Sequence, residues 1–291
     1  MADPRGFRQK GQVLLAVLAF SLWAVSQSAG AQTLHAVIVA DTSDASIGVS
    51  VKKDFDRNIS LVNAIARNTT LTLSLHALTG SKLTLNNLRN TVKGLKVGKN
   101  DAVLFYYSGH GYRLWAKKSK WPLLYVSQQG LDFGELVDTI RRKKPRFFLA
   151  VTDSCNEYAD KRPERRSFAM KKGGPPKLNY RRLWVETHGE IVIGSSSKGE
   201  FAWGDDTKGG YFSARFFASH QNEVKKAAPN WENILKTAKR PISLTWENTT
   251  YTQNPMVDSK VSYKVSAAFP NRPGIVIVAL PGPVGSAGLN R

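Results

Sequence analysis

The sequence predicts an α/β fold in which a largely parallel β-sheet is flanked by helices. Short apolar runs recur along the chain, as buried strands do, and the segments between them carry apolar residues at helical spacing. Alternation of strands and helices is typical of parallel sheets, because each crossover connection is long enough to hold a helix. With 291 residues, 42% of them hydrophobic, the chain can bury a substantial core.

The individual elements follow from these two patterns. Strands are expected at residues 34–40, 70–78, 102–107, 146–151, 190–194 and 274–280. Helices are expected at residues 51–65, 84–95, 133–140, 212–217 and 231–238, where apolar residues repeat every three or four positions. Active sites of such folds collect at the carboxyl ends of the strands, so the residues that follow each strand are examined first for function.

The first 31 residues have the three parts of a secretory signal peptide. Three cations lie within residues 1–10, an apolar run covers residues 13–25, and the segment ends Ala29-Gly30-Ala31. This run is shorter than the roughly 20 residues that span a bilayer. We therefore expect cleavage after Ala31 and export to the periplasm or the medium. The alternative is an uncleaved anchor, which would be the chain's one attachment to a membrane.

Charge and cysteine content narrow the function classes. The formal net charge is +20, which indicates acidic partners or a role in solubility, and says nothing about fold. The single cysteine, Cys155, excludes an intramolecular disulfide and any cysteine-rich zinc or iron–sulfur site.

Two stretches lack the strand and helix patterns. Residues 161–182 contain nine lysines and arginines, one acid and a Gly-Gly-Pro-Pro sequence, which predicts a long exposed basic loop. The loop is interpreted either as a site of cleavage or as a solvated segment that is never cut. Residues 281–291 are rich in glycine and proline and are expected to form a flexible tail.

Reactive residues follow two of the predicted strands. Residues 102–107 run directly into Ser108-Gly109-His110-Gly111, and residues 146–151 run into Asp153-Ser154-Cys155. If the two strands are neighbours, His110 and Cys155 face each other at the sheet edge. A lone cysteine is more often a small buried hydrophobe, and a histidine between glycines can be a turn residue. Their occurrence together at matching strand ends favours catalysis.

This pair has a definite chemistry. A thiol is a weak nucleophile until an imidazole accepts its proton, and the same imidazole can later protonate a leaving amine. The backbone N–H groups of Gly111 and Cys155 are candidates to bind the oxyanion that develops on the substrate carbonyl.

The motifs FYYSGHG and FFLAVTDSCN resemble those of the caspase and metacaspase family of cysteine peptidases. The opening segment HAVIVADTSDASIGVSVKKD resembles the family's first strand, loop and helix, and IVIGSSSKGEFAWGDDTKGGYFSARFF resembles its small-subunit part. The resemblance covers about residues 33–255 and implies a three-layer α/β/α caspase–haemoglobinase fold. It divides one domain into a large-subunit-like part at 32–160, the basic linker at 161–182 and a small-subunit-like part at 183–280.

The resemblance also implies roles for individual residues. His110 matches the general base, Cys155 the nucleophile, and Gly111 with the Cys155 amide the oxyanion donors. Asp153 matches the metacaspase acid that helps to bind a basic P1 side chain, the substrate residue before the scissile bond. Asp54 matches a second pocket acid, with Asp56 as the alternative.

Ser196 lies in a Ser195–Ser197 turn, which is interpreted as a wall of the substrate pocket.

The match to the metacaspase motif is not complete. After the nucleophile the chain reads Asn156-Glu157-Tyr158, where metacaspases usually continue with His-Ser-Gly, and Glu157 could fill the acidic pocket or lie in solvent.

These observations lead to one functional expectation and its rivals. We expect an exported caspase-like cysteine endopeptidase that cleaves peptides or proteins after Arg or Lys, with self-processing in the basic loop as one of the two interpretations of that loop. The alternative is a catalytically silent caspase-like module that binds an anionic or protein partner through its basic surface, and ligation instead of hydrolysis is a further variant. No organic cofactor or bound metal is expected, although calcium dependence stays open: Glu200 with Asp205-Asp206 is a weak candidate site, read as a solvated turn. No nucleic-acid-binding motif is found.

Overall fold

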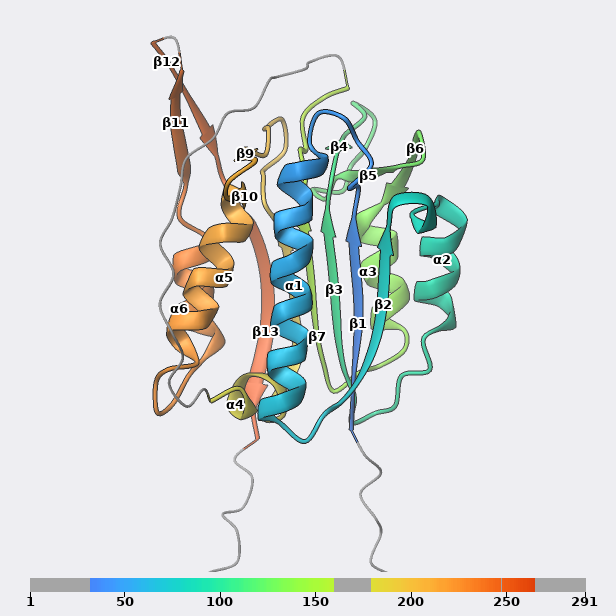
Figure 1. The fold of residues 1–291 in the computed structure, drawn as a ribbon, viewed down its shortest axis with the longest axis vertical. Coiled ribbons are helices and arrows are strands. Elements are labelled where there is room, and N and C mark those ends of the chain that lie inside the picture. Colours follow the sequence, from blue (N-terminus) through green and yellow to red (C-terminus); the bar gives the residue numbers. More distant parts are fainter. Residues whose placement is uncertain (1–31, 160–178, 247, 265–291) are drawn as a thin grey trace, which may run out of the picture. The chain divides into compact units, whose positions relative to one another are not determined.

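A six-stranded β-sheet forms the centre of the fold (Figure 1). The structure, a computed structural model, describes residues 32–159, 179–246 and 248–264. The strand order is β13-β8-β7-β3-β1-β2. All neighbours are parallel except β13, which runs antiparallel to β8. The strands are β1 (Thr33–Ala40), β2 (Thr72–Thr79), β3 (Ala102–Ser108), β7 (Phe147–Asp153), β8 (Thr187–Gly194) and β13 (Met256–Tyr263).

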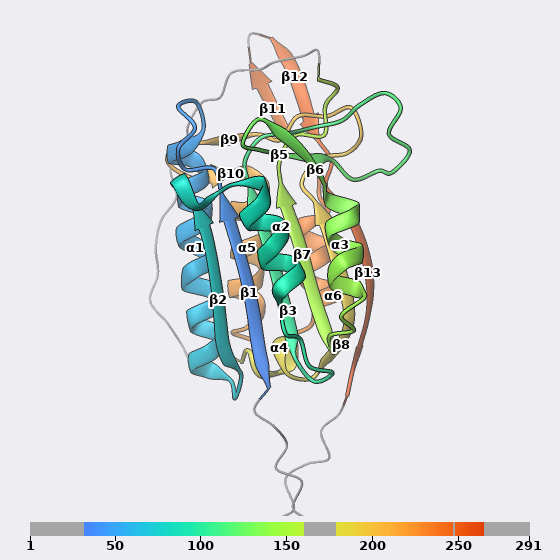
Figure 2. The same ribbon diagram turned by 90° about the vertical axis from the view of Figure 1, so that its right-hand side faces the viewer.

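Helices cover both faces of this sheet (Figure 2). On one face lie α1 (Gly48–Asn68), α4 (Arg181–Trp184), α5 (Tyr211–Glu223) and α6 (Trp231–Ala238). On the other lie α2 (Leu85–Gly94) and α3 (Phe133–Arg141), with a short 3₁₀ turn η1 (Gly80–Lys82) before α2. The expected three-layer α/β/α architecture is therefore confirmed.

Strand β3 contributes side chains to the hydrophobic cores on both faces of the sheet. All seven of its residues are buried. Leu104 and Tyr106 belong to the core under α1, whereas Val103, Phe105 and Tyr107 belong to the core under α2. Successive side chains of a strand point to opposite faces, so a strand with helices on both sides needs a continuous apolar run. This requirement explains why the sequence shows apolar runs in place of alternation.

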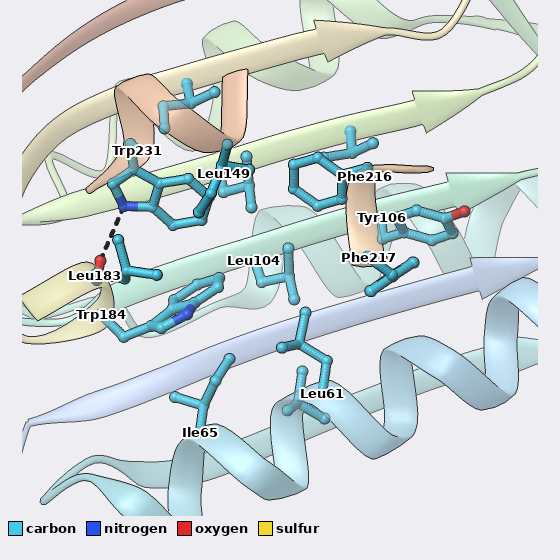
Figure 3. Packing of buried hydrophobic residues seen from close by; sticks show 14 of the residues in the cluster. Leu61, Ile65, Leu104, Tyr106, Leu149, Leu183, Trp184, Phe216, Phe217 and Trp231 are labelled. Atoms are coloured by element: carbon cyan, nitrogen blue, oxygen red, sulfur yellow. Dashed lines mark hydrogen bonds between the residues drawn. The ribbon is translucent and has the colours of Figure 1, made fainter. Parts of the chain in front are cut away.

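Two tryptophans anchor the core on the α1 face (Figure 3). Trp184 and Trp231 are fully buried, and their rings lie 5.5 Å apart. Trp231 Nε1 donates a hydrogen bond to the Leu183 carbonyl at 3.0 Å, so the indole satisfies its polar atom inside the core. Removing an aromatic side chain of this kind costs about 3–5 kcal/mol.

The element predictions that fall on described residues are largely confirmed, and one strand of the sheet was not predicted. The first five predicted strands correspond to β1, β2, β3, β7 and β8, and the five predicted helices to α1, α2, α3, α5 and α6. The predicted strand at residues 274–280 lies outside the described residues. The strand that completes the sheet in the structure is β13, which has no buried residue and so carries no apolar run.

Short strands that the sequence did not reveal lie beyond the carboxyl ends of β1, β3 and β7 (Figures 1 and 2). Strands this short offer too few residues for a period to be recognised. They are β4 (Gly111–Tyr112), β5 (Leu123–Val126), β6 (Gln129–Asp132), β9 (Gly204–Asp205), β10 (Gly209–Gly210), β11 (Ile242–Trp246) and β12 (Thr249–Gln253).

The basic loop ends earlier than expected. Helix α4 begins at Arg181, so Arg181 and Arg182 are helical and not part of a loop. The rest of the loop, up to residue 178, lies outside the described residues, as do the predicted signal peptide and the tail. Across the ranges that the structure does describe, no helix is long and apolar enough to cross a membrane.

Candidate active site

The two reactive residues lie at equivalent positions beyond neighbouring strands. Strand β3 pairs with β7, and the last residue pair in the register is Ser108 with Asp153. The Gly109 amide donates to the Asp153 carbonyl at 3.3 Å, which keeps the two chains together just past the strands. His110 and Cys155 each follow two residues after that last pair. The expectation that the two strands are neighbours is thus confirmed, and the sheet brings both residues to one edge.

Gly111 lies against the Cys155 segment. A Cβ atom at this position would be 2.5 Å from the Cys155 carbonyl oxygen and 2.7 Å from Ser154 Cβ, so only glycine allows this approach. The His110 carbonyl accepts from the Tyr125 amide of β5, and two residues beyond Gly111 the Arg113 amide donates to the Glu157 carbonyl at 2.9 Å. N–H groups two residues apart in a strand point to the same side. We infer that the Gly111 amide faces the segment that follows Cys155.

Cys155 is half-buried and its sulfur meets the backbone of Ala202. The Ala202 amide donates to Cys155 Sγ at 3.3 Å, and the thiol is 3.8 Å from the Ala202 carbonyl. An N–H group aimed at the sulfur stabilises the thiolate more than the thiol. The segment after β8 therefore contributes to the environment of the Cys155 sulfur.

The serine turn after β8, Ser195–Ser197, fixes the loop that contains Cys155. Ser196 is fully buried, and its hydroxyl donates to the Ser154 carbonyl at 2.9 Å. Ser195 Oγ accepts from the Ser154 amide at 3.1 Å. The prediction that Ser196 lines a substrate pocket is therefore corrected. Its side chain is buried and hydrogen-bonded to the backbone next to Cys155.

His110 has an acidic neighbour that the sequence analysis missed. His110 Nε2 lies 3.3 Å from Asp44 Oδ2 and 3.4 Å from Ser46 Oγ. Asp44 Oδ1 accepts from the Ser46 and Ile47 amides at 2.8 and 3.0 Å, so its position is fixed by the turn that leads into α1. Partial burial alone would raise the pKa of Asp44, but the Ser46 hydrogen bonds and the nearby His110 lower it overall. Asp44 follows the carboxyl end of β1, and this position is the signal by which it could have been found.

The two predicted pocket acids form a buried pair. The side chain of Asp54 on α1 is fully buried, and Asp153 at the end of β7 is 4% exposed. Asp54 accepts hydrogen bonds from Ser108 Oγ at 2.9 Å and from the Gly210 amide at 3.0 Å. Burial, together with the charge of Asp153, raises the pKa of Asp54 to about 8. The pair therefore retains one proton near neutral pH.

Each acid also has an internal partner. Arg57 Nη1 donates to Asp54 Oδ1 at 2.9 Å, and the Ser213 hydroxyl donates to Asp153 Oδ2 at 2.6 Å. The alternative acid, Asp56, lies outside this cluster: it is exposed and forms an ion pair with Lys52 at 2.8 Å. Among the three candidate acids, the structure thus brings Asp54 and Asp153 together and excludes Asp56.

Two adjacent glycines cover the acid pair. A Cβ atom on Gly210 would be 1.9 Å from Asp153 Oδ2, and one on Gly209 would be 2.3 Å from Asp54 Oδ1. Gly209 also has a φ of 74°, which L side chains rarely adopt. Strand β10, which consists of these two glycines, can therefore lie on the carboxylates only because both residues lack side chains. In this arrangement neither carboxylate faces solvent.

The residues directly after the nucleophile have structural partners. Asn156 is fully buried: its Oδ1 accepts from Arg113 Nη1 at 2.8 Å and its Nδ2 donates to the Lys120 carbonyl at 2.8 Å. Glu157 neither fills the acidic pocket nor lies in solvent. It is 6% exposed, and its carboxylate accepts from the Tyr158 amide at 2.7 Å.

The residues considered for calcium do not form a cluster. Glu200 accepts from the Ser197 and Asn254 amides, and Asp205 accepts from the amides of Thr207 and Lys208 in its own turn. Asp205 is only 2% exposed, whereas Asp206 and Thr207 of the same turn are exposed. Within the described ranges, no group of three or more His, Cys, Asp or Glu side chains is arranged to hold a metal ion.

Comparison with known proteins places this geometry in context. A family model described as a caspase domain matches residues 56–266. Among solved structures, the fold is similar to a protein from Geobacter sulfurreducens (12% identity, TM-score 0.48, covering 77% of this chain and 93% of that one). It is also similar to caspase-1 from Spodoptera frugiperda (12% identity, TM-score 0.49, covering 78% of this chain and 87% of that one). No curated protein sequence matches the chain.

Proposed function

The chain belongs to the caspase-domain family, and from that premise we propose that it is a cysteine endopeptidase with Cys155 as nucleophile and His110 as general base. The observation that carries the proposal is the register of β3 and β7. It gives His110 and Cys155 equivalent positions past one edge of the sheet, with Gly111 packed against the nucleophile segment. Family membership makes a peptide or protein the expected substrate.

The proposed reaction has two steps. Cys155 Sγ attacks the scissile carbonyl carbon while its proton passes to His110, and the Gly111 and Cys155 amides stabilise the oxyanion. His110 then gives the proton to the leaving amine, and a thioester remains on Cys155. In the second step water, deprotonated by His110, hydrolyses the thioester and releases the acid product and the free thiol.

We further propose that the enzyme cleaves after Arg or Lys. Two carboxylates suit a guanidinium, which offers a planar set of donors, and Asp54 and Asp153 supply such a pair beside the Cys155 segment. Because Gly209 and Gly210 of β10 cover both acids, the P1 side chain would have to displace this short strand to reach them. Substrate binding and movement of β10 would then be one event.

Export and self-processing complete the proposal. Residues 1–31 would direct the chain out of the cytoplasm and be removed after Ala31, and the basic segment 161–178 would supply Arg and Lys cleavage sites. Amino-terminal sequencing of the protein from its natural host tests the first point. A mature chain that begins at Gln32 is expected, and one that retains Met1 would contradict it.

Turnover of fluorogenic peptides tests the proposed activity. Peptides ending in Arg, Lys, Asp or Asn before the fluorophore are incubated with the purified protein and with Cys155→Ala, in the presence of a reductant and with or without calcium. We expect Cys155-dependent turnover of the Arg and Lys peptides only. Absence of turnover on every peptide would overturn the enzyme reading in favour of a silent binding module. Turnover of the Asp peptide alone would agree with the His110–Cys155 dyad but would overturn the proposed role of Asp54 and Asp153 in binding the P1 side chain.

A further inference from the structure

A groove between α1 and α5 lies beside the buried acid pair, with Arg57 in contact with both the groove and Asp54. The two helices lie next to each other on one face of the sheet (Figure 1), and the space between them has a volume of about 700 Å³. We call this space the α1–α5 groove; α1, α5, Tyr180 and the 207–208 turn line it. Neither His110 nor Cys155 is among its lining residues. A volume of this size is typical of small-molecule sites.

The charge of the groove is strongly positive. Among the described residues, four cations line it: Lys53, Arg57, Arg67 and Lys208. In the same described lining, Asp56 is the one acid, and it is already paired with Lys52 at 2.8 Å. Within the described part of the chain, neither Lys53 nor Arg67 lies within ion-pair distance of a carboxylate. Four cations around one concave space attract anions, because a low-dielectric wall strengthens their common field.

Arg57 connects this surface to the interior. One of its guanidinium nitrogens donates to the buried Asp54, and its side chain stays 30% exposed on the groove side. Guanidinium has five N–H donors, so a second anion can bind to the same group without breaking the first contact. The groove therefore has one cation that is held rigidly by the fold.

A buried imidazole on the groove wall carries an unused donor. His220 is fully buried, and its Nε2 lies 3.0 Å from Trp184 Nε1. Indole nitrogen can only donate, so His220 Nε2 accepts and the neutral ring carries its proton on Nδ1. Burial lowers the pKa of His220 to about 3, so the ring is neutral at ordinary pH. No described residue accepts a hydrogen bond from His220 Nδ1, which is a rare state for a buried donor.

From these observations we propose that the α1–α5 groove binds a small organic anion with two or more phosphate or carboxylate groups. Lys53, Arg57, Arg67 and Lys208 would hold the anionic groups, with charge-assisted and bidentate hydrogen bonds from the arginines. Leu61 and Phe217, which also line the groove, would contact the apolar part of the ligand. Binding would have to open the wall next to His220 for its buried Nδ1–H group to donate to an acceptor atom of the ligand.

Isothermal titration calorimetry on the full chain tests this proposal. Pyrophosphate and citrate are the two probes, which separate phosphate from carboxylate recognition, at physiological ionic strength. The variant Lys53→Gln/Arg67→Gln removes two groove cations. The matched control Arg89→Gln/Lys93→Gln removes two cations from α2, on the opposite face of the sheet. Measuring Cys155→Ala as well keeps the result independent of the proposed peptidase activity.

We expect saturable binding of at least one probe to the wild-type chain and to Cys155→Ala, with one site. The Lys53→Gln/Arg67→Gln variant is expected to bind at least about tenfold more weakly, and the α2 control within about twofold of wild type. Equal weakening in both double variants would show that the anion responds to net charge alone and would overturn the proposal. Absence of saturable binding of either probe to the wild-type chain would overturn it as well.

Discussion

Because Asp54 and Asp153 are buried together, the protonation state of the pair depends on the charge of any group bound next to it. Asp54 has a pKa of about 8 because it is desolvated and faces a second carboxylate. In the free protein the pair therefore carries one negative charge below pH 8. A P1 guanidinium would favour the doubly ionised pair, so its binding would expel the proton.

This proton release predicts a pH dependence of substrate affinity. Because Asp54 must lose its proton when a basic peptide binds, affinity should fall as the pH drops below about 8, by up to about tenfold per pH unit. The dissociation constant of an Arg-terminated peptide is measured on Cys155→Ala, which removes catalysis, between pH 6 and 9. In Cys155→Ala/Asp54→Asn the slope should vanish. An equal slope in both proteins would show that another group is responsible.

Asp44 is expected to act as a positioning residue for His110. Asp44→Asn keeps an acceptor for the Ser46 and Ile47 amides and removes the negative charge 3.3 Å from His110 Nε2. We expect kcat to fall about tenfold or more while KM stays nearly constant, since a neutral amide orients and stabilises the imidazolium less well. The control is Asp56→Asn, which removes an exposed carboxylate from α1. A lower kcat in both variants, or in neither, would contradict this role.

Among the secondary-structure elements, the sequence predicted the buried strands and the amphipathic helices. It did not predict the exposed edge strand β13 or the short strands outside the central sheet. The fully buried strands β3 and β7 are recognisable in the sequence as apolar runs, and the residues that directly follow them can be located from those runs. Asp44 was missed because it follows β1 and contacts His110, which follows β3, and this contact depends on the two strands being neighbours in the sheet. Ser196 was assigned to a pocket because a sequence shows where a turn lies but not to which side its hydroxyls point.

The junction of β3 and β7 yields a prediction about Gly111. In Gly111→Ala the new methyl group would collide with the Cys155 carbonyl and Ser154 Cβ, at 2.5 and 2.7 Å. Overpacking of this kind should cost about 1–3 kcal/mol in the free energy of unfolding and displace the nucleophile segment. Urea denaturation and peptide turnover measure the two effects. Gly94→Ala is the control, since its Cβ would have no neighbour within 4 Å. An active Gly111→Ala variant with an unchanged midpoint would refute the packing argument.

At the scale of the whole molecule, the two halves of the chain share one sheet. Strand β7 lies before residues 161–178 and β8 after them, yet the two are hydrogen-bonded neighbours. The core under α1 likewise combines Leu104 and Leu149 from the first half with Phe216 and Trp231 from the second. Predicting this union needed the strand order, which the family resemblance implied and local sequence patterns could not supply.

Cleavage within residues 161–178 should therefore leave the domain intact. A denaturing gel would show two fragments, whereas size-exclusion chromatography without denaturant would show a single species at the elution volume of the uncut protein. The reason is that the cut breaks no strand pairing of the sheet. Separation of the fragments on the column would contradict the shared core as the main source of stability. The same gel, run on wild type and Cys155→Ala, shows whether the cut is made by the protein itself.

The proposed enzyme depends on two features: His110 activates Cys155, and the Asp54–Asp153 pair selects a basic P1 residue. Because Cys155 is the chain's single cysteine, intact-mass spectrometry reports its alkylation by a peptidyl-arginine chloromethyl ketone without interference from other thiols. We expect one adduct on the wild-type protein, formed at least about a hundredfold faster than with the matching aspartate reagent, and slowed about a hundredfold or more in His110→Ala. Equal rates for the two reagents, or for wild type and His110→Ala, would contradict this expectation.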